Sequence, residues 1–294
     1  ALGVDLGADH VRALRVNERG EVIARSARSP GRAGLASTLR DVLRARRSKD
    51  GTSGEPPGVA LPWATDEVPT DVTTTLAQGA PMPVLIGVGA ATALAEAWCG
   101  AARGTRDLIT FGVDEHVTAG VLVDGVVLRG AHGYAGSVEW LSLNPVERAD
   151  YRRYGGLGAE VSAAGIVRRV VWRIKSGDRS AVADSVGGDL SRIAADLVFA
   201  AAHAGDGVSI SVVRDTARYV AMAVSNMAAV LDPQTIVLGG ILATSGAQML
   251  DAIRVECSRR MRPSQAGRIT IVLSTLGPDA AAIGAARAAL LQRQ

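Results

Sequence analysis

The chain has 294 residues, 48% of them hydrophobic and only 3% aromatic, and its formal net charge is +3. This length and composition can bury a large core in one or two domains, and the scattered basic residues are only a weak indication of an anionic partner. Because no apolar run reaches about 18 residues and no signal-peptide pattern opens the sequence, we expect a cytoplasmic protein without a membrane span.

The first hundred residues predict one α/β unit that begins with three short strands. Apolar stretches at 2–6, 11–16 and 21–26 are separated by polar turns at 7–10 and 17–20, which is typical of an antiparallel meander. From helical spacing and bounded apolar runs, the rest of this unit is predicted as a helix at 33–46, a strand at 58–62, a helix at 68–79, a strand at 82–88 and a helix at 90–103.

The same succession of elements then recurs. The later elements are predicted as strands at 107–113, 116–125 and 126–130, helices at about 160–175, 186–204 and 208–231, a strand at 235–240, a helix at 244–262, a strand at 268–274 and a helix at 278–291. A meander followed by helices, present twice, indicates a duplicated α/β fold with a ligand cleft between its halves. We expect one domain at 1–100, with the helix at 278–291 packing back on it, and a second at 101–277.

Three stretches of the sequence carry family motifs. They are "GVDLGADHVRALRVNERGEVIARS" at 3–26, "VTAGVLVDGVVLRGAHGYAGSVEW" at 117–140, and "LDPQTIVLGG" at 231–240 with "AAAIGAARAAL" near the end. Together they resemble the ROK family of repressors, open reading frames and sugar kinases. The resemblance implies a two-domain, actin-like α/β fold. It also implies either ATP-dependent phosphorylation of a sugar or sugar sensing by a transcriptional regulator.

The position of the kinase base is the first departure from the kinase pattern. Sugar-kinase members carry Glu-Asn-Asp-Ala-Asn after the strand at 82–88, and aligning on "ALAEA" places Val88 at the aspartate. Valine cannot accept the hydroxyl proton, and no carboxylate lies within four residues of it. A positioned base contributes about 10²–10⁴-fold to a rate, so the resemblance implies that phosphoryl transfer is lost.

The sugar-binding and zinc motifs are also altered. The kinase pattern Glu-x-Gly-His reads "SVEW", with Ser137 for the glutamate and Trp140 for the histidine. The zinc-binding cysteines are replaced by Tyr151, Arg153 and Gly158, which offer no thiolate or imidazole. We therefore expect no metal and no cofactor. Cys99 and Cys257 are far apart and isolated, so we expect from them neither a zinc site nor a disulfide.

Any surviving effector pocket is expected to involve His132, Ser137 and Trp140. The resemblance leaves two interpretations of Trp140: an exposed platform on which a sugar stacks, or a side chain that has collapsed inward and fills the old pocket. The indole could bury about 150–250 Å² in the second case. His132 is expected either to contact the ligand or to form a hydrogen bond within its loop.

The phosphate-binding turns have gained acids. In "DLGADHVR" the family's Asp5, Gly7 and Arg12 remain, but Asp9 replaces a threonine and would repel phosphate. The second turn, Gly-Thr-Gly in kinases, reads Asp114-Glu115-His116; these are metal-ligand types, but adjacent residues rarely converge on one ion. Gly239 and Gly240 match the adenosine-side turn, or simply end a strand. We describe Asp5, Gly7, Arg12, Gly239 and Gly240 as a degenerate nucleotide site.

The sequence therefore predicts a catalytically inactive ROK protein. We expect the effector-sensing and dimerisation domain of a sugar-responsive transcriptional regulator, with a sugar or sugar phosphate as ligand and a homodimer as assembly. The regulators of the family carry a winged helix-turn-helix ahead of this domain, so DNA contact is expected only through such a segment outside this chain. The alternatives are an ATP-dependent hexose or N-acetylamino-sugar kinase and a dimerisation scaffold without a ligand.

Overall fold

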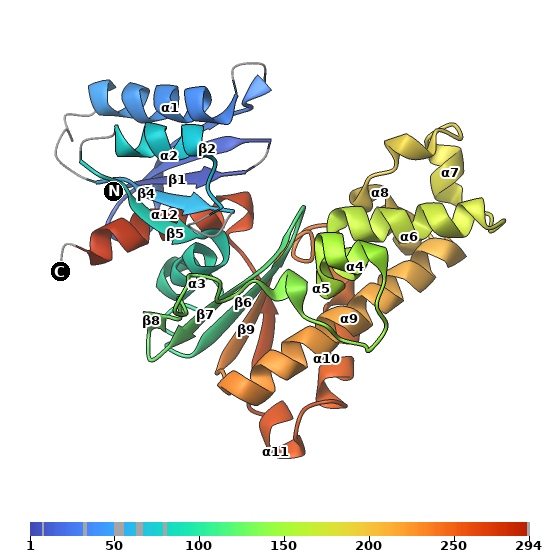
Figure 1. Cartoon of the computed structure of the whole chain (residues 1–294). Helices are drawn as coiled ribbons and strands as arrows, with labels where there is room; N and C mark the ends of the chain where they lie inside the picture. Colours follow the sequence, from blue (N-terminus) through green and yellow to red (C-terminus); the bar gives the residue numbers. More distant parts are fainter. Residues whose placement is uncertain (8, 32–33, 50–55, 63–66, 79–80, 293–294) are drawn as a thin grey trace. The chain divides into compact units, whose positions relative to one another are not determined.

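The computed structural model describes residues 1–7, 9–31, 34–49, 56–62, 67–78 and 81–292, with only the backbone at 45–49. The chain divides into two compact units (Figure 1). The first unit contains Ala1–Thr110, Gly120–Gly136 and Leu276–Gln294, and the second contains Phe111–Ala119 and Ser137–Thr275. The first unit thus takes in a stretch after residue 110 as well as the end of the chain.

The first unit is built on a five-stranded mixed sheet in the order β3-β2-β1-β4-β5. Its strands are β1 (Leu2–Leu6), β2 (Val11–Val16), β3 (Val22–Arg28), β4 (Gly58–Leu61) and β5 (Val84–Gly87). The first three are antiparallel, as the predicted meander requires, and β4 and β5 extend the sheet in parallel from β1.

Helices cover both faces of this sheet (Figure 1). They are α1 (Leu35–Lys49), α2 (Thr70–Ala77), α3 (Val88–Cys99), the short η5 (Gly277–Asp279) and α12 (Ala280–Leu291). The alanine-rich α12 lies so close to the sheet that a Cβ at Gly58 would come within 1.7 Å of the carbonyl oxygen of Ala285. Small side chains replace aromatic ones here, which accounts for a core built with so few rings.

A second mixed sheet has the order β10-β9-β6-β7-β8. Its strands are β6 (Leu108–Val113), β7 (Val117–Val123), β8 (Val126–Val127), β9 (Thr235–Gly240) and β10 (Thr270–Leu273). The helices of the second unit are η2 (Val138–Trp140), α4 (Ala149–Tyr154), α5 (Gly156–Val161), α6 (Ala163–Lys175), α7 (Ala181–Ser185), η3 (Leu190–Arg192), α8 (Ala195–His203), α9 (Gly207–Leu231), η4 (Ala247–Met249), α10 (Leu250–Ser258) and α11 (Pro263–Ala266).

The predicted α/β class and the repeated meander are confirmed. Two helix predictions were too long: the stretch 186–204 is divided among a turn, η3 and α8, and the stretch 244–262 begins with a turn and η4 before α10. Glycines and local turns interrupt the apolar spacing in both stretches, with Gly187 and Gly188 in the first and Gly246 in the second, and spacing alone does not register such breaks. The cysteines are free thiols, with Cys257 buried and Cys99 half-buried.

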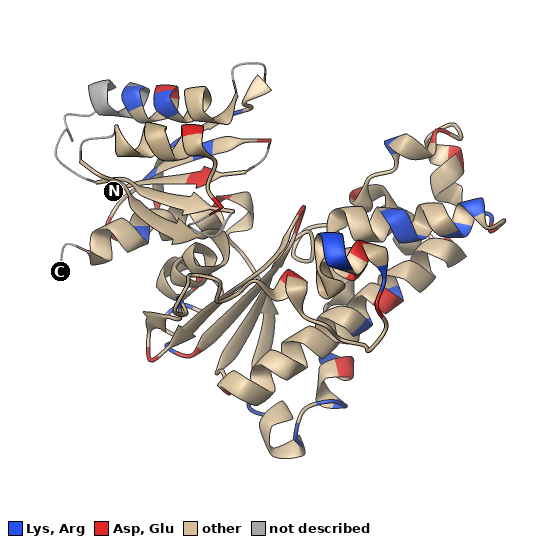
Figure 2. Cartoon of the chain, viewed as in Figure 1, with Lys and Arg blue, Asp and Glu red and all other residues tan. Residues whose placement is uncertain are grey.

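Charged side chains are interspersed along both units, with both signs on α4 and only basic side chains on α6 (Figure 2). This distribution agrees with the scattered basic residues of the sequence. Within the described part of the chain, no single helix is long and apolar enough to span a membrane; only α8 and α9, taken as a pair bent by 111°, meet that length and composition.

Candidate functional site

The predicted site residues are divided between the two units. Asp5, Gly7, Arg12, Val88 and His132 belong to the first unit, and Ser137, Trp140, Gly239 and Gly240 belong to the second.

The turn between β1 and β2 is closed by its own side chains. Asp5 is buried, and its Oδ2 lies 3.1 Å from Nε2 of His10 and accepts a hydrogen bond of 3.3 Å from Arg12 Nη1. The other ring nitrogen of His10 lies 2.7 Å from Asp9 Oδ1. The His10 ring also packs on Gly7, where a Cβ would come within 2.3 Å of it. The imidazole therefore lies within the turn, in contact with Gly7, Asp5 and Asp9.

These contacts shift two pKa values in opposite directions. The hydrogen bond to Asp5 is the main cause that raises the pKa of His10 above its usual 6.5, against the opposing effect of burial. The hydrogen bond from His10 is the main cause that lowers the pKa of Asp9. Both shifts favour a charged imidazolium paired with carboxylates.

Arg12 is the cation that the phosphate motif retains, and its guanidinium forms hydrogen bonds and ion pairs with other groups of the protein. Besides Asp5, its Nη1 donates a hydrogen bond of 2.6 Å to the carbonyl of Pro278, and its Nε lies 3.6 Å from Asp279 Oδ1. Asp279 also forms an ion pair with Arg25. The cations of this cluster thus face three carboxylates, and a phosphate would have to displace one of these contacts.

Val88 is the first residue of α3, directly after β5. Its side chain has no proton-accepting group, and the nearest acid along α3 is Glu96. Glu96 is fully buried and accepts the backbone N–H of Ala101 at 2.7 Å, at the opposite end of the helix. The segment that begins at the predicted base position therefore offers no exposed carboxylate.

In the second unit the structure brings together two elements of the predicted nucleotide site. The backbone N–H of Ile241 donates to Val113 O at 2.7 Å and to Asp114 Oδ1 at 3.1 Å. Gly240 has φ +64°, and a Cβ there would lie 2.5 Å from Asp114 Oδ2. The carboxylate of Asp114 thus lies directly against the glycine turn and bonds its backbone. A Cβ added at Gly239 would have its nearest neighbour, the Cβ of Ser274, at 3.9 Å, which is an ordinary contact distance.

Ser137 and Trp140 belong to the short turn η2, which we call the η2 turn (residues 137–140). Ser137 is exposed, and Trp140 exposes 56% of its surface. The interpretation in which Trp140 has collapsed inward is therefore wrong, and the interpretation as an exposed platform is retained. His132 is also exposed, on a loop of the first unit.

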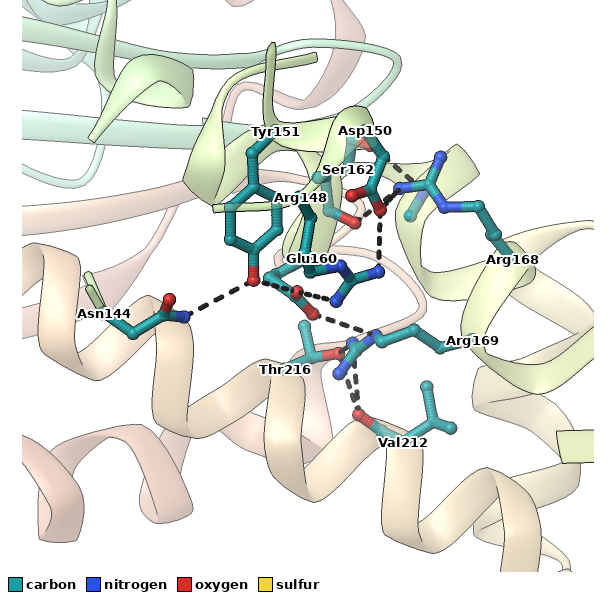
Figure 3. Close-up of polar contacts among 12 residues, drawn as sticks. Asn144, Arg148, Asp150, Tyr151, Glu160, Ser162, Arg168, Arg169, Val212 and Thr216 are labelled. Carbon is teal, nitrogen blue, oxygen red and sulfur yellow. Dashed lines mark hydrogen bonds and ion pairs between the residues drawn. The ribbon is translucent and has the colours of Figure 1, made fainter. Parts of the chain in front are cut away.

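A charge cluster around the buried carboxylate of Glu160 occupies the stretch where the kinase pattern has its zinc-binding cysteines (Figure 3). Tyr151 donates a hydrogen bond of 2.6 Å to Glu160 Oε1, and Arg148 donates one of 3.1 Å to the same oxygen. Arg169 Nε lies 3.9 Å from Glu160 Oε2, and its Nη2 donates to Thr216. Burial lowers the pKa of Arg169. We call Arg148, Tyr151, Glu160 and Arg169 the Glu160 cluster.

The other predicted replacements lie around this cluster. Arg153 lies over the ring of Tyr154, with its guanidinium carbon 5.1 Å from the ring centre, and Gly158 packs against Glu139. Among the residues that the structure describes, no group of three or more histidine, cysteine or acidic side chains could hold a metal ion. Asp114 and His116, adjacent to Glu115 in the sequence, contact different partners, Ile241 and Glu139.

The sequence analysis missed the Glu160 cluster and the contact between His116 and Glu139. Glu160 could have been noticed, because it is a lone acid inside the apolar stretch "GLGAEVSAAG", and a buried carboxylate needs a partner. Which arginines reach it depends on the packing of α4, α6 and α9, and no local pattern encodes that.

The fold and its two sheets match those of solved structures that include both a transcriptional regulator and sugar kinases. A ROK-family transcriptional regulator, a homologue of the Escherichia coli MLC protein, superposes with a TM-score of 0.83 at 20% identity, over 98% of this chain and 77% of the other. A glucokinase from Streptomyces griseus, solved with glucose and AMPPNP, gives 0.80 at 21% identity, over 97% of each chain. At this identity the likeness establishes the fold alone.

The chain belongs to the ROK family, whose sequence model matches residues 62–293. A glucokinase from Halalkalibacterium halodurans is 31% identical over 209 residues, which are 69% of this chain. The match spans 62% of that glucokinase. The relatives thus include both kinases and regulators, so membership in the family leaves the choice between catalysis and sensing to the residues of the site.

Proposed function

We propose that this chain is a catalytically inactive ROK domain that binds a sugar or sugar phosphate and dimerises within a sugar-responsive transcriptional regulator. The observation that carries the proposal is Val88 at the start of α3, where the kinase pattern has its base. A kinase must remove a proton from the attacking hydroxyl. The nearest acid along α3, Glu96, does not replace the missing base, because it is buried and accepts the backbone N–H of Ala101.

The two acidic turns support the loss of nucleotide chemistry. In the first, His10 and Arg12 are paired with Asp5, so the positive groups already face carboxylates. In the second, the carboxylate of Asp114 lies against Gly240 and accepts the N–H of Ile241, so a negative charge already lies at the glycine turn. A triphosphate would meet these carboxylates without a compensating free cation from the same turns, and like charges about 4 Å apart repel by roughly 4 kcal/mol at intermediate dielectric.

The η2 turn supports a sensing role. Trp140 exposes its indole while its backbone is bonded to Ser137 through Trp140 N–H, at 3.2 Å. An exposed ring on an ordered turn offers an apolar face against which the C–H face of a sugar packs, and the exposed Ser137 hydroxyl adds a polar contact. The proposed recognition is therefore by stacking with few hydrogen bonds.

The regulatory assignment is supported by a sequence relative, a xylose repressor from Caldicellulosiruptor bescii, which is 26% identical over 69% of this chain. In this proposal DNA is contacted through a helix-turn-helix segment outside residues 1–294, and the domain described here contributes sensing and the dimer contact. The competing proposal is an ATP-dependent sugar kinase, favoured by the 31% identity with a glucokinase. In that case a base from another part of the chain must replace the missing aspartate.

One experiment separates the two proposals. The chain is mixed with ATP, Mg²⁺ and a panel of hexoses, N-acetylamino sugars and their 6-phosphates, and both ADP release and thermal unfolding are recorded. We expect no sugar-dependent ADP and a raised melting temperature with at least one panel member; a ligand at 100 times its Kd adds about 2.7 kcal/mol. Sugar-dependent ADP release that disappears on mutation of a site residue establishes the kinase instead. The absence of both sugar-dependent ADP release and a melting-temperature shift would contradict sensing. The dimerisation scaffold without a ligand would then be the remaining proposal.

A further inference from the structure

A charged contact joins the η2 turn to the turn between β6 and β7. His116 Nδ1 lies 3.3 Å from Glu139 Oε2, and Glu139 directly precedes Trp140. In the aligned kinase motifs both positions are glycine, within Gly-Thr-Gly and Glu-x-Gly-His. The contact is therefore made of two side chains that this chain has in addition to the family pattern.

The backbone of the η2 turn is already held on its other side. Gly155, at φ +74°, lies so close that a Cβ would come within 2.1 Å of the Glu139 carbonyl oxygen. Gly158 packs on the side chain of Glu139: a Cβ added at Gly158 would lie 3.2 Å from the Cβ of Glu139. The Glu139 side chain is three-quarters covered, at 26% exposure, while the neighbouring indole of Trp140 is mostly exposed. A displacement of Glu139 therefore also moves Trp140, because the two residues are joined by one peptide bond.

We propose that His116 is a positioning residue that holds the η2 turn, and with it the Trp140 indole, in the orientation that receives the ligand. The inference rests on the proposed sensing function, and it adds regulation to it. Binding is coupled to the protonation of His116, because only the imidazolium forms a full ion pair with Glu139.

The charges that act on His116 have one sign. They are Glu139, on the η2 turn, and Glu115, on the same turn as His116. Asp114 precedes them in the sequence, with Oδ1 bonded to Ile241. The hydrogen bond to Glu139 is the main cause that raises the pKa of His116 above 6.5, against burial. Since the folded pKa is raised, the ion pair is present at low pH and is lost as pH rises through that folded value.

The test follows the Trp140 indole directly and needs no ligand. The chain is labelled with 5-fluorotryptophan, and its ¹⁹F resonance for Trp140 is identified as the one missing from Trp140→Phe. Between about pH 5 and 9, we expect this resonance to move in one sigmoid with a midpoint above 6.5. In His116→Gln and in Glu139→Gln the movement is lost. His203→Gln, an exposed histidine at the end of α8, is the matched control and keeps it.

Two outcomes overturn the inference: a Trp140 resonance that does not change with pH, or one that titrates equally in His116→Gln. In a second arm, the panel sugar that shifts the melting temperature is titrated below and above the observed midpoint. We expect about tenfold weaker binding above it, and no pH dependence in His116→Gln. If the resonance titrates but no sugar binds, the ion pair stands and the sensing proposal fails. If a sugar binds independently of pH, sensing stands and the coupling is wrong.

Discussion

The hydroxyl of Tyr151 donates a 2.6 Å hydrogen bond to the buried carboxylate of Glu160, and the tyrosine stands where the kinase pattern has its first zinc-binding cysteine. Arg148 and Arg169 approach the same carboxylate from the N-terminal end of α4 and from α6. The Glu160 cluster therefore links α4, α5 and α6, and one of its members stands at a cysteine position of the zinc motif. Its carboxylate is buried, so the integrity of the cluster should matter for stability.

Glu160→Gln is expected to lower the free energy of unfolding by about 3–5 kcal/mol, because it removes from the largely buried Arg169 the carboxylate with the larger effect on it. Tyr151→Phe removes one hydrogen bond to a charged group and should lower it by about 1.5–3 kcal/mol. The matched control is Glu147→Gln, which breaks an ion pair with Arg152 in which both side chains are about 80% exposed; exposed pairs contribute about 0–1 kcal/mol. Urea denaturation measures all three. Equal effects at Glu147 and Glu160 would contradict the role of the cluster.

A chelator should leave the protein intact. Since the cysteine positions hold Tyr151, Arg153 and Gly158, we expect purified protein washed with EDTA to contain far less than one zinc per chain and to keep its melting temperature. Elemental analysis and calorimetry before and after the wash check this. Stoichiometric zinc that resists washing, or a melting temperature that falls on its removal, would show that another ligand set exists.

The parts of the fold that the sequence predicts are those encoded in local patterns. The meander of β1, β2 and β3 was recognisable from short apolar runs between polar turns, and the identity of Val88 at the head of α3 could be read from a motif. These features depend on neighbours within a few residues. The spacing of apolar residues therefore predicts where the strands lie. The motif alignment shows that a proton-accepting side chain is missing at the position of the base.

The sequence could not tell what the replaced residues do instead. Asp9 was recognised as hostile to phosphate, but its contact with His10, and the contact of His10 with Asp5, depend on the shape of the turn. The partners of Glu160, which lies on α5, come from two other helices, α4 with its N-terminal flank and α6. The sequence also left open whether Trp140 is buried or exposed, because a tryptophan can serve either as a core side chain or as an exposed platform for a ligand.

Val88→Asp alone should not create a sugar kinase. The substitution supplies a carboxylate at the start of α3, which would contribute about 10²–10⁴-fold if a base were the sole missing part. The acidic turns at Asp9 and Asp114 remain, with Asp114 still bonded to the N–H of Ile241. We expect no sugar-dependent ADP release above the wild-type chain in a coupled assay. Measurable turnover in this single variant would show that the phosphate turns still accept ATP.

Stability should depend on pH through His10 and His116. Both have a folded pKa above the unfolded value of 6.5, so their contribution is fully present below 6.5 and is lost as pH rises through the folded values. Asp9, whose pKa is lowered, contributes above its unfolded value of 3.8 and loses that contribution only as pH falls further. We therefore expect the unfolding free energy of the wild type to fall from about pH 6 to 9 more steeply than that of His10→Gln combined with His116→Gln. Parallel curves for the two proteins would contradict the pairing.

Trp140→Ala should separate ligand binding from stability. Trp140 exposes 56% of its surface, so its removal leaves no enclosed cavity, and we expect the unfolding free energy to change by no more than about 0.5 kcal/mol, as for other surface substitutions. If the indole is the platform of the sugar, the ligand-induced rise in melting temperature should disappear, because the stacking area is lost while the Ser137 hydroxyl alone binds weakly. Trp172→Ala is the control, since Trp172 is a comparably exposed indole, at 65%, on α6. It should keep both the stability and the ligand response. A Trp140→Ala protein that still responds to the same sugar would place the effector site elsewhere on the chain, and a loss of about 3–5 kcal/mol would mean that the ring is packed as a core residue.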